Sequence, residues 1–137
     1  MISQTTKSTM QLNRKQIEAV MTLPGPKRYS YFIKVAADWE EIWGLYADGW
    51  ALAATDDDQP VLPVWPAKEY ADLCANGKWS GYVPKSISLE SFMGELLPNL
   101  AKDGVLPGVF YTPSDRGIVP SVDALLAELN AELSLYQ

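Results

Sequence analysis

Residues 42–54 read Ile-Trp-Gly-Leu-Tyr-Ala-Asp-Gly-Trp-Ala-Leu-Ala-Ala. Two apolar segments, 42–46 and 50–54, lie on either side of the dipeptide Asp48-Gly49. Asp-Gly favours the tight turn with positive φ that joins the two strands of a hairpin. We therefore predict a β-hairpin over these residues and a sheet at the centre of the fold.

The segments on both sides of this hairpin also have strand-like patterns. Residues 29–35 alternate with a period of two, as a half-buried strand does. Residues 61–65 predict another strand, which Pro60 and Pro63 place at an edge or a break because proline has no backbone donor. Residues 105–111 predict the last strand. Together these segments predict an antiparallel sheet of four to six strands, arranged as a meander.

Four segments have the features of helices. The third carries apolar side chains at helical spacing and contains Pro98, which should end or kink it. The triplet Pro24-Gly25-Pro26 should end the first helix. The four helices are predicted to follow Asn13, Pro66, Ser88 and Ser121.

Helices of this length do not persist alone in water, so their apolar faces must pack against another element. The fold class is therefore predicted as α+β, with about four helices packed mainly on one face of the sheet. Residues 1–11 are polar and are predicted to form a flexible tail. Residues 12–137 show no linker or repeat and are predicted to form a single α+β domain.

The composition supports a folded domain in a reducing compartment. The chain is 47% hydrophobic and 20% charged, which is typical of a globular protein. No apolar run approaches the roughly 20 residues that a membrane helix needs, so no membrane partner is expected. Its one cysteine, Cys74, cannot form an internal disulfide, and we therefore predict a cytoplasmic location.

The charge is acidic overall and unevenly distributed. The net charge is −6, yet residues 1–36 carry six of the eleven basic residues and one of the seventeen acids. An acidic body repels phosphate, so no nucleic-acid partner is expected. A basic protein partner would be attracted, and this is the predicted partner class. The oligomeric state stays open.

The residues that most enzymes use are missing. Histidine is absent, which removes the commonest general base and the commonest metal ligand. We predict no catalytic residue, no metal site and no cofactor. The acidic run 56–58 lacks the spacing of a calcium loop and is interpreted as a solvated turn. Cys74 lies on the apolar side of a predicted helix and is interpreted as a buried structural thiol.

Aromatic side chains are the most informative group. Eleven of the fifteen lie between Tyr29 and Tyr82, and either a tryptophan-rich core or a recognition surface would explain them. Trp79 and Tyr82 are the first binding candidates, because they lie in the polar, Gly-rich segment 76–82 without a pattern that buries them. The full set of predicted binding residues is Trp79, Tyr82, Trp65, Tyr70 and Lys85.

Four segments resemble a bacterial family known as domain of unknown function 2750. They are Tyr-Phe-Ile-Lys-Val-Ala at 31–36, Trp-Gly-Leu-Tyr-Ala-Asp-Gly-Trp at 43–50, Pro-Val-Trp-Pro-Ala-Lys-Glu-Tyr-Ala at 63–71 and Pro-Lys-Ser-Ile-Ser-Leu at 84–89. The resemblance covers residues 12–136 and brings no catalytic residues. The order of elements is also similar to that of SseB-like N-terminal domains and of some bacterial immunity proteins, a likeness that does not carry function.

Three functions are compatible with these observations. The first is a non-enzymatic protein-binding module, for example an immunity or regulatory protein. The second is a self-associating structural subunit. The third is an enzyme that uses carboxylate, tyrosine or lysine chemistry without histidine, which would require a pocket with converging polar groups. The missing catalytic groups and the many aromatic residues favour the binding module.

Overall fold

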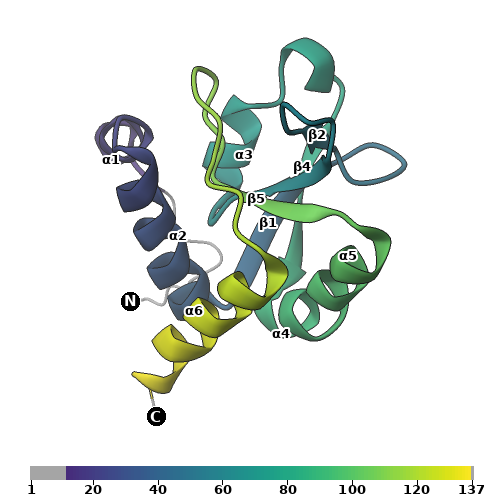
Figure 1. The fold of residues 1–137 in the computed structure, drawn as a ribbon. Helices are drawn as coiled ribbons and strands as arrows, with labels where there is room; N and C mark the ends of the chain where they lie inside the picture. Colours follow the sequence, from purple (N-terminus) through teal and green to yellow (C-terminus); the bar gives the residue numbers. More distant parts are fainter. Residues whose placement is uncertain (1–11, 137) are drawn as a thin grey trace.

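The structure, a computed structural model, describes residues 12–136 and confirms the α+β class (Figure 1). Helices lie at the periphery and the short strands pass through the middle of the molecule. The predicted tail, 1–11, lies outside the described residues. The elements in chain order are α1 (Arg14–Met21), α2 (Gly25–Trp39), β1 (Glu41–Tyr46), β2 (Ala53–Ala54), β3 (Pro60–Val64), α3 (Lys68–Leu73), η3 (Gly77–Trp79), β4 (Val83–Ser88), α4 (Leu89–Ser91), η4 (Phe92–Leu96), α5 (Leu97–Asp103), β5 (Leu106–Val109) and α6 (Val122–Ser134).

The strands form two small sheets, which corrects the prediction of one antiparallel meander. β1 pairs antiparallel with β4, while β3 lies between β2 and β5. The β3–β5 pair is parallel. A parallel pair requires a crossover of a dozen or more residues, and the segment between β3 and β5, which contains α3, β4 and α4–α5, supplies it. Trp43 and Trp65 join the two sheets by exchanging backbone hydrogen bonds of 2.9 and 2.8 Å.

The prediction of a strand at 29–35 is wrong, because these residues lie inside helix α2. The short alternating pattern coincides with part of a longer helical one, whose buried positions are Arg28, Tyr29, Phe32, Ile33, Ala36 and Ala37. The prolines at 24 and 26 separate α1 from α2, and they also begin α2, since the first helical turn needs no backbone donor. The 3.6-residue period becomes visible only when the window extends beyond 35.

The predicted hairpin over 42–54 is present only in part. Its first segment is β1, and Asp48 has the positive φ of 60° expected in the turn. The second segment makes a single bridge, Tyr46 to Trp50, before the chain turns away to form the two-residue strand β2 with β3. Gly44 allows the ring of Trp50 to pack closely on β1, since this ring occupies the space where a side chain on residue 44 would lie.

Three of the four predicted helix starts are confirmed by their caps. Asn13 and Gln16 form the capping box of α1, and the hydroxyls of Ser88 and Ser121 accept hydrogen bonds at the starts of α4 and α6. The helix from 89 to 103 passes through Pro98 without ending there. Its middle, η4, is a π-helical segment, so Pro98 falls in the first turn of α5, where its missing donor matters little.

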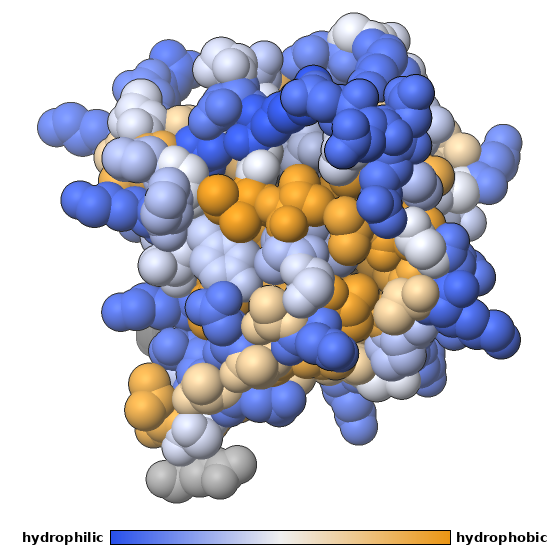
Figure 2. Space-filling view, in the orientation of Figure 1, coloured by the Kyte–Doolittle hydropathy of each residue, from blue (hydrophilic) through white to orange (hydrophobic). Residues whose placement is uncertain are grey.

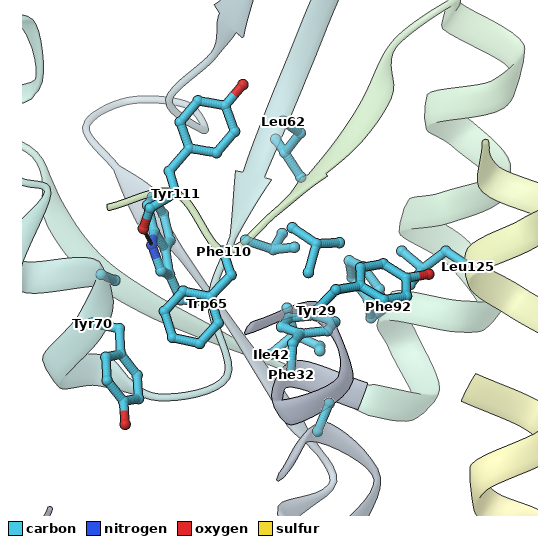
Figure 3. Packing of buried hydrophobic residues seen from close by; sticks show 14 of the residues in the cluster. Tyr29, Phe32, Ile42, Leu62, Trp65, Tyr70, Phe92, Phe110, Tyr111 and Leu125 are labelled. Carbon is cyan, nitrogen blue, oxygen red and sulfur yellow. Dashed lines mark hydrogen bonds between the residues drawn. The ribbon is translucent and has the colours of Figure 1, made fainter. Parts of the chain in front are cut away.

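One hydrophobic core lies between the helices and the strands (Figure 3). Its largest fully buried side chains are aromatic, namely Trp65, Tyr70, Phe32, Phe92 and Phe110. The outer face seen in Figure 2 is mostly hydrophilic, with a band of apolar side chains across its middle. Within residues 12–136, no helix has the length and apolar character needed to cross a membrane.

Gly117 allows the chain to return closely against β5. A Cβ atom at this position would overlap the carbonyl oxygen of Val109 and would lie 2.9 Å from the ring of Tyr111. The Val109 carbonyl is part of a backbone bridge to Ile118, and the Tyr111 side chain is buried, so neither can move easily.

We expect Gly117→Ala to lower the free energy of unfolding by about 1 to 3 kcal/mol, the usual effect of overpacking. Gly94→Ala is the matched control, because a Cβ atom at Gly94 meets nothing within 4 Å and alanine favours a helix. Urea unfolding of both variants measures the difference. Equal stability of the two would contradict the tight packing at Gly117.

Candidate functional site

The structure separates the five predicted binding residues into two groups. Trp65 and Tyr70 are fully buried and Trp79 is 9% exposed, so these three belong to the core. Tyr82 is half-buried and packs against the same core. Lys85 is exposed on β4, away from the buried rings. The burial of Trp65, Tyr70 and Trp79 favours the core interpretation of most of the aromatic residues. The role of the five residues in binding stays a prediction.

Lys85 belongs to a small surface cluster of its own. Its Nζ lies 3.9 Å from the ring centre of Tyr46 and 5.6 Å from that of Trp50. The two rings meet edge to face at 5.2 Å. A lysine over aromatic faces gains about 0.5–1 kcal/mol at an exposed position. This contact stabilises the β1–β4 pair and the turn after β1.

Trp65 and Cys74 meet at the backbone carbonyl of Tyr111. The indole N–H of Trp65 donates to the Tyr111 carbonyl at 2.8 Å, and the Cys74 thiol donates to the same oxygen at 3.5 Å. Trp79 packs edge to face on Trp65 at 6.3 Å. Burial raises the pKa of the Cys74 thiol to about 11, so the nucleophilic thiolate is scarce at neutral pH.

Arg28 is a buried cation that sequence reasoning missed. Its side chain is 3% exposed and donates to the carbonyls of Leu23, Phe110 and Arg116 and to the carboxylate of Asp115. Arg28 lies in the first turn of α2. The sequence pattern predicted a strand at 29–35, so Arg28 was not expected in a helix. The guanidinium therefore ties α2 to the chain that follows β5.

Phe110, one of the acceptors of Arg28, has a backbone conformation that is rare for a bulky residue. Its φ is 68°, in the left-handed region. Its N–H donates to the Val64 carbonyl at 2.9 Å, and its ring packs against Tyr70 at 4.8 Å. Figure 3 shows the rings of Phe110 and Tyr111 on opposite sides of the chain that follows β5.

Tyr111 and Trp79 form the inner wall of a cleft of about 430 Å³, which we call the aromatic cleft. It lies between the segment 74–79 and the turn 111–116. Lys78 and Arg116 contribute its cationic side chains. Its one carboxylate, Asp115, is paired with Arg28 at 3.1 Å.

A second hollow, which we call the acidic groove, runs between α4–η4 and α6. Its volume is about 530 Å³. Its apolar surface comes from Leu89, Met93, Leu126 and Leu133, and its charged side chains are Glu40 and Glu90. Gly94 and Asn130 complete the lining, and no basic residue contributes to it.

The buried tyrosines have structural partners. The hydroxyls of Tyr31 and Tyr70 lie 3.1 Å apart, and Tyr29 donates to Glu128 at 2.8 Å. Burial, followed by these hydrogen bonds, raises the pKa of Tyr29 and Tyr70 above the ordinary value. Among residues 12–136, no group of three or more acidic, Cys or His side chains converges in a way that could hold a metal ion.

Comparison with known proteins gives one match. No curated protein and no solved structure matches the sequence. The model of one family, whose description is "protein of unknown function (DUF2750)", matches residues 29–129. The matched region begins in α2, ends in α6 and contains both the aromatic cleft and most of the acidic groove. The chain therefore belongs to the family of proteins of unknown function DUF2750.

Proposed function

We propose that the protein is a non-enzymatic protein-binding module whose acidic groove binds a basic amphipathic helix of a partner. The observation that carries the proposal is the composition of the groove. Four apolar side chains line a surface hollow whose only charged side chains are carboxylates. Helix-in-groove binding uses such a surface, with apolar anchors at the i, i+3 or i+4 and i+7 positions of the bound helix.

The helices that form the groove carry further acidic side chains outside its lining. Helix α6 carries Asp123, Glu128 and Glu132, the α4–η4 segment carries Glu90 and Glu95, and neither contains a lysine or arginine. Their combined field attracts a basic helix and accelerates the encounter. An immunity or regulatory protein that binds a basic target is the biological role that these features support.

The same charges disfavour self-association through this groove. A second copy would bring carboxylates against carboxylates, and like charges across an interface weaken binding. A basic partner instead neutralises Glu40 and Glu90 while its apolar side chains cover Leu126 and Leu133.

Two designed helical peptides test the proposal. Both carry leucines at i, i+4 and i+7; one has lysines and the other glutamates at the flanking positions. We expect the lysine peptide to bind with at least about tenfold higher affinity, a difference of about 1.4 kcal/mol, measured by calorimetry at low salt. Equal affinities, or no binding of the lysine peptide at millimolar concentration, would contradict the proposal.

Gly94→Gln locates the binding site. The new side chain starts where a Cβ atom has no neighbour within 4 Å, so it extends into the groove without disturbing the core. We expect this variant to bind the lysine peptide at least about tenfold more weakly while it unfolds at the same urea concentration or a higher one. Gly94→Ala, which adds a single methyl group, is the control and should bind nearly normally.

A further inference from the structure

We infer that the aromatic cleft is a second binding site, one that takes a small organic anion with a ring-shaped or apolar body. It is separate from the acidic groove, and its charged side chains have the opposite sign. The inference depends on the placement of Trp79 and Tyr111 beside Lys78 and Arg116.

The cleft has the size and lining of a small-molecule site. Its volume of about 430 Å³ lies within the range of roughly 300–1,000 Å³ typical of such sites. The ring centres of Trp79 and Tyr111 are 6.3 Å apart and inclined at 55°, so the two rings contact each other at an angle. Both residues are mostly buried, and they line the cleft with the small part of their surface that stays exposed. Cys74 and Ala53 add apolar surface, while Asn76 adds a polar group.

The backbone around the cleft is held rigidly, which favours binding because little ordering is left for the ligand to impose. Arg28 fixes the turn through Asp115 and the carbonyl of Arg116. Tyr111 is held in place because Gly108 and Gly117 leave room for its ring: a Cβ atom on either would lie 2.9 Å from it.

The left-handed φ of Phe110 is the strained position that directs the next residue into the cleft. Such strain is commonest at binding and catalytic sites. The carbonyl of the next residue, Tyr111, accepts hydrogen bonds from Trp65 and Cys74, while the Tyr111 ring lines the cleft.

The charges at the cleft favour an anion. Arg116 lies close enough to Tyr111 to oppose the rise that burial causes in the pKa of that hydroxyl. The Nζ of Lys78 lies 5.2 Å from the ring centre of Trp79. Each cation therefore lies beside one of the two aromatic walls, where an anionic group on a bound ring would meet it.

Asp56 is the competing anion within the protein. Its carboxylate accepts from Arg116 at 2.9 Å, but the two side chains are 89% and 62% exposed. Exposed ion pairs of this kind are weak, so a ligand can replace Asp56 without a large penalty. This exchange leads to an unusual expectation: removal of Asp56 should strengthen binding.

Two probes with the same ring and opposite charge test the inference, namely 1-naphthylacetate and 1-naphthylmethylammonium. Binding is followed through the indole N–H signal of Trp79 in ¹H–¹⁵N spectra of the full chain. We expect the anion to shift this signal saturably and to bind at least about tenfold more tightly than the cation. Equal affinities, or no saturable shift of the Trp79 signal at millimolar concentration, would overturn the inference.

Three variants give the test its specificity. The double variant Lys78→Gln with Arg116→Gln should abolish the preference for the anion, and Asp56→Asn should tighten anion binding severalfold. Gly94→Gln, in the acidic groove, should leave both affinities unchanged. Because the two sites are tested with ligands of opposite charge, the aromatic cleft can fail while the groove binds its peptide, and the reverse. An unchanged preference in the double variant would contradict the inference.

Discussion

We expect Arg28→Met to lower the free energy of unfolding by about 3 to 5 kcal/mol, measured by urea denaturation. Arg28 is 2% exposed, and the hydrogen bonds of its guanidinium reach Leu23, Phe110, Arg116 and Asp115. Three of these acceptors are backbone carbonyls, which no substitution removes. Methionine fills a similar volume but leaves the carbonyls without their donor, and unsatisfied buried polar groups cost about 1 to 3 kcal/mol each.

Two controls separate this explanation from a general loss of charge. Lys27→Met removes an exposed cation from the adjacent position and should change stability by less than about 0.5 kcal/mol. Asp115→Asn removes the ionic partner, whose side chain is 61% exposed, and should cost less than about 1 kcal/mol. If Arg28→Met is no more harmful than Asp115→Asn, the carbonyls do not depend on Arg28, and our account of this residue is wrong.

We expect Trp79→Ala to lower the free energy of unfolding by about 3 to 5 kcal/mol, the range for truncation of a large buried aromatic residue. Trp79 is 9% exposed and contacts Trp65 edge to face and Tyr111 at an angle, both with ring centres 6.3 Å apart. Its removal leaves a cavity beside the fully buried Trp65. Thermal or urea unfolding measures the loss.

Tyr136→Ala is the matched control, because Tyr136 is an aromatic residue that is 55% exposed. This variant should unfold within about 0.5 kcal/mol of the wild type. Trp79→Phe should recover part of the stability, since a smaller ring still packs on Trp65. A stable Trp79→Ala protein would instead mean that the ring contributes little to the core, and its main role would then be contact with a ligand or partner.

Local rules predicted the capped helices well, but they missed helix α2 and the pairing of the strands. A cap and an apolar face are local features, so Asn13, Ser88 and Ser121 were recognised as helix starts from their own neighbours. The pairing of strands depends on residues distant in the chain. The parallel partner of β3, for example, lies more than forty positions away, and no local pattern identified it.

The candidate site shows the same division. The sequence indicated that Trp79 is an unusual residue, but it gave no reason to place Trp79 beside Tyr111 or beside a cation from the turn at 116. Arg28 was overlooked because a buried arginine is recognised by its partners, and all but one of these lie about eighty positions or more further along the chain.

By itself, the sequence determined the α+β class, the capped helix starts at Asn13, Ser88 and Ser121, the acidic charge and the lack of histidine, because each of these is a property of composition or of a few neighbouring residues. Only the tertiary structure decided that β3 and β5 are parallel and that Arg28 holds the strained Phe110. The reason is that burial and hydrogen bonding between distant segments outweigh the weak preference of a short segment for one conformation.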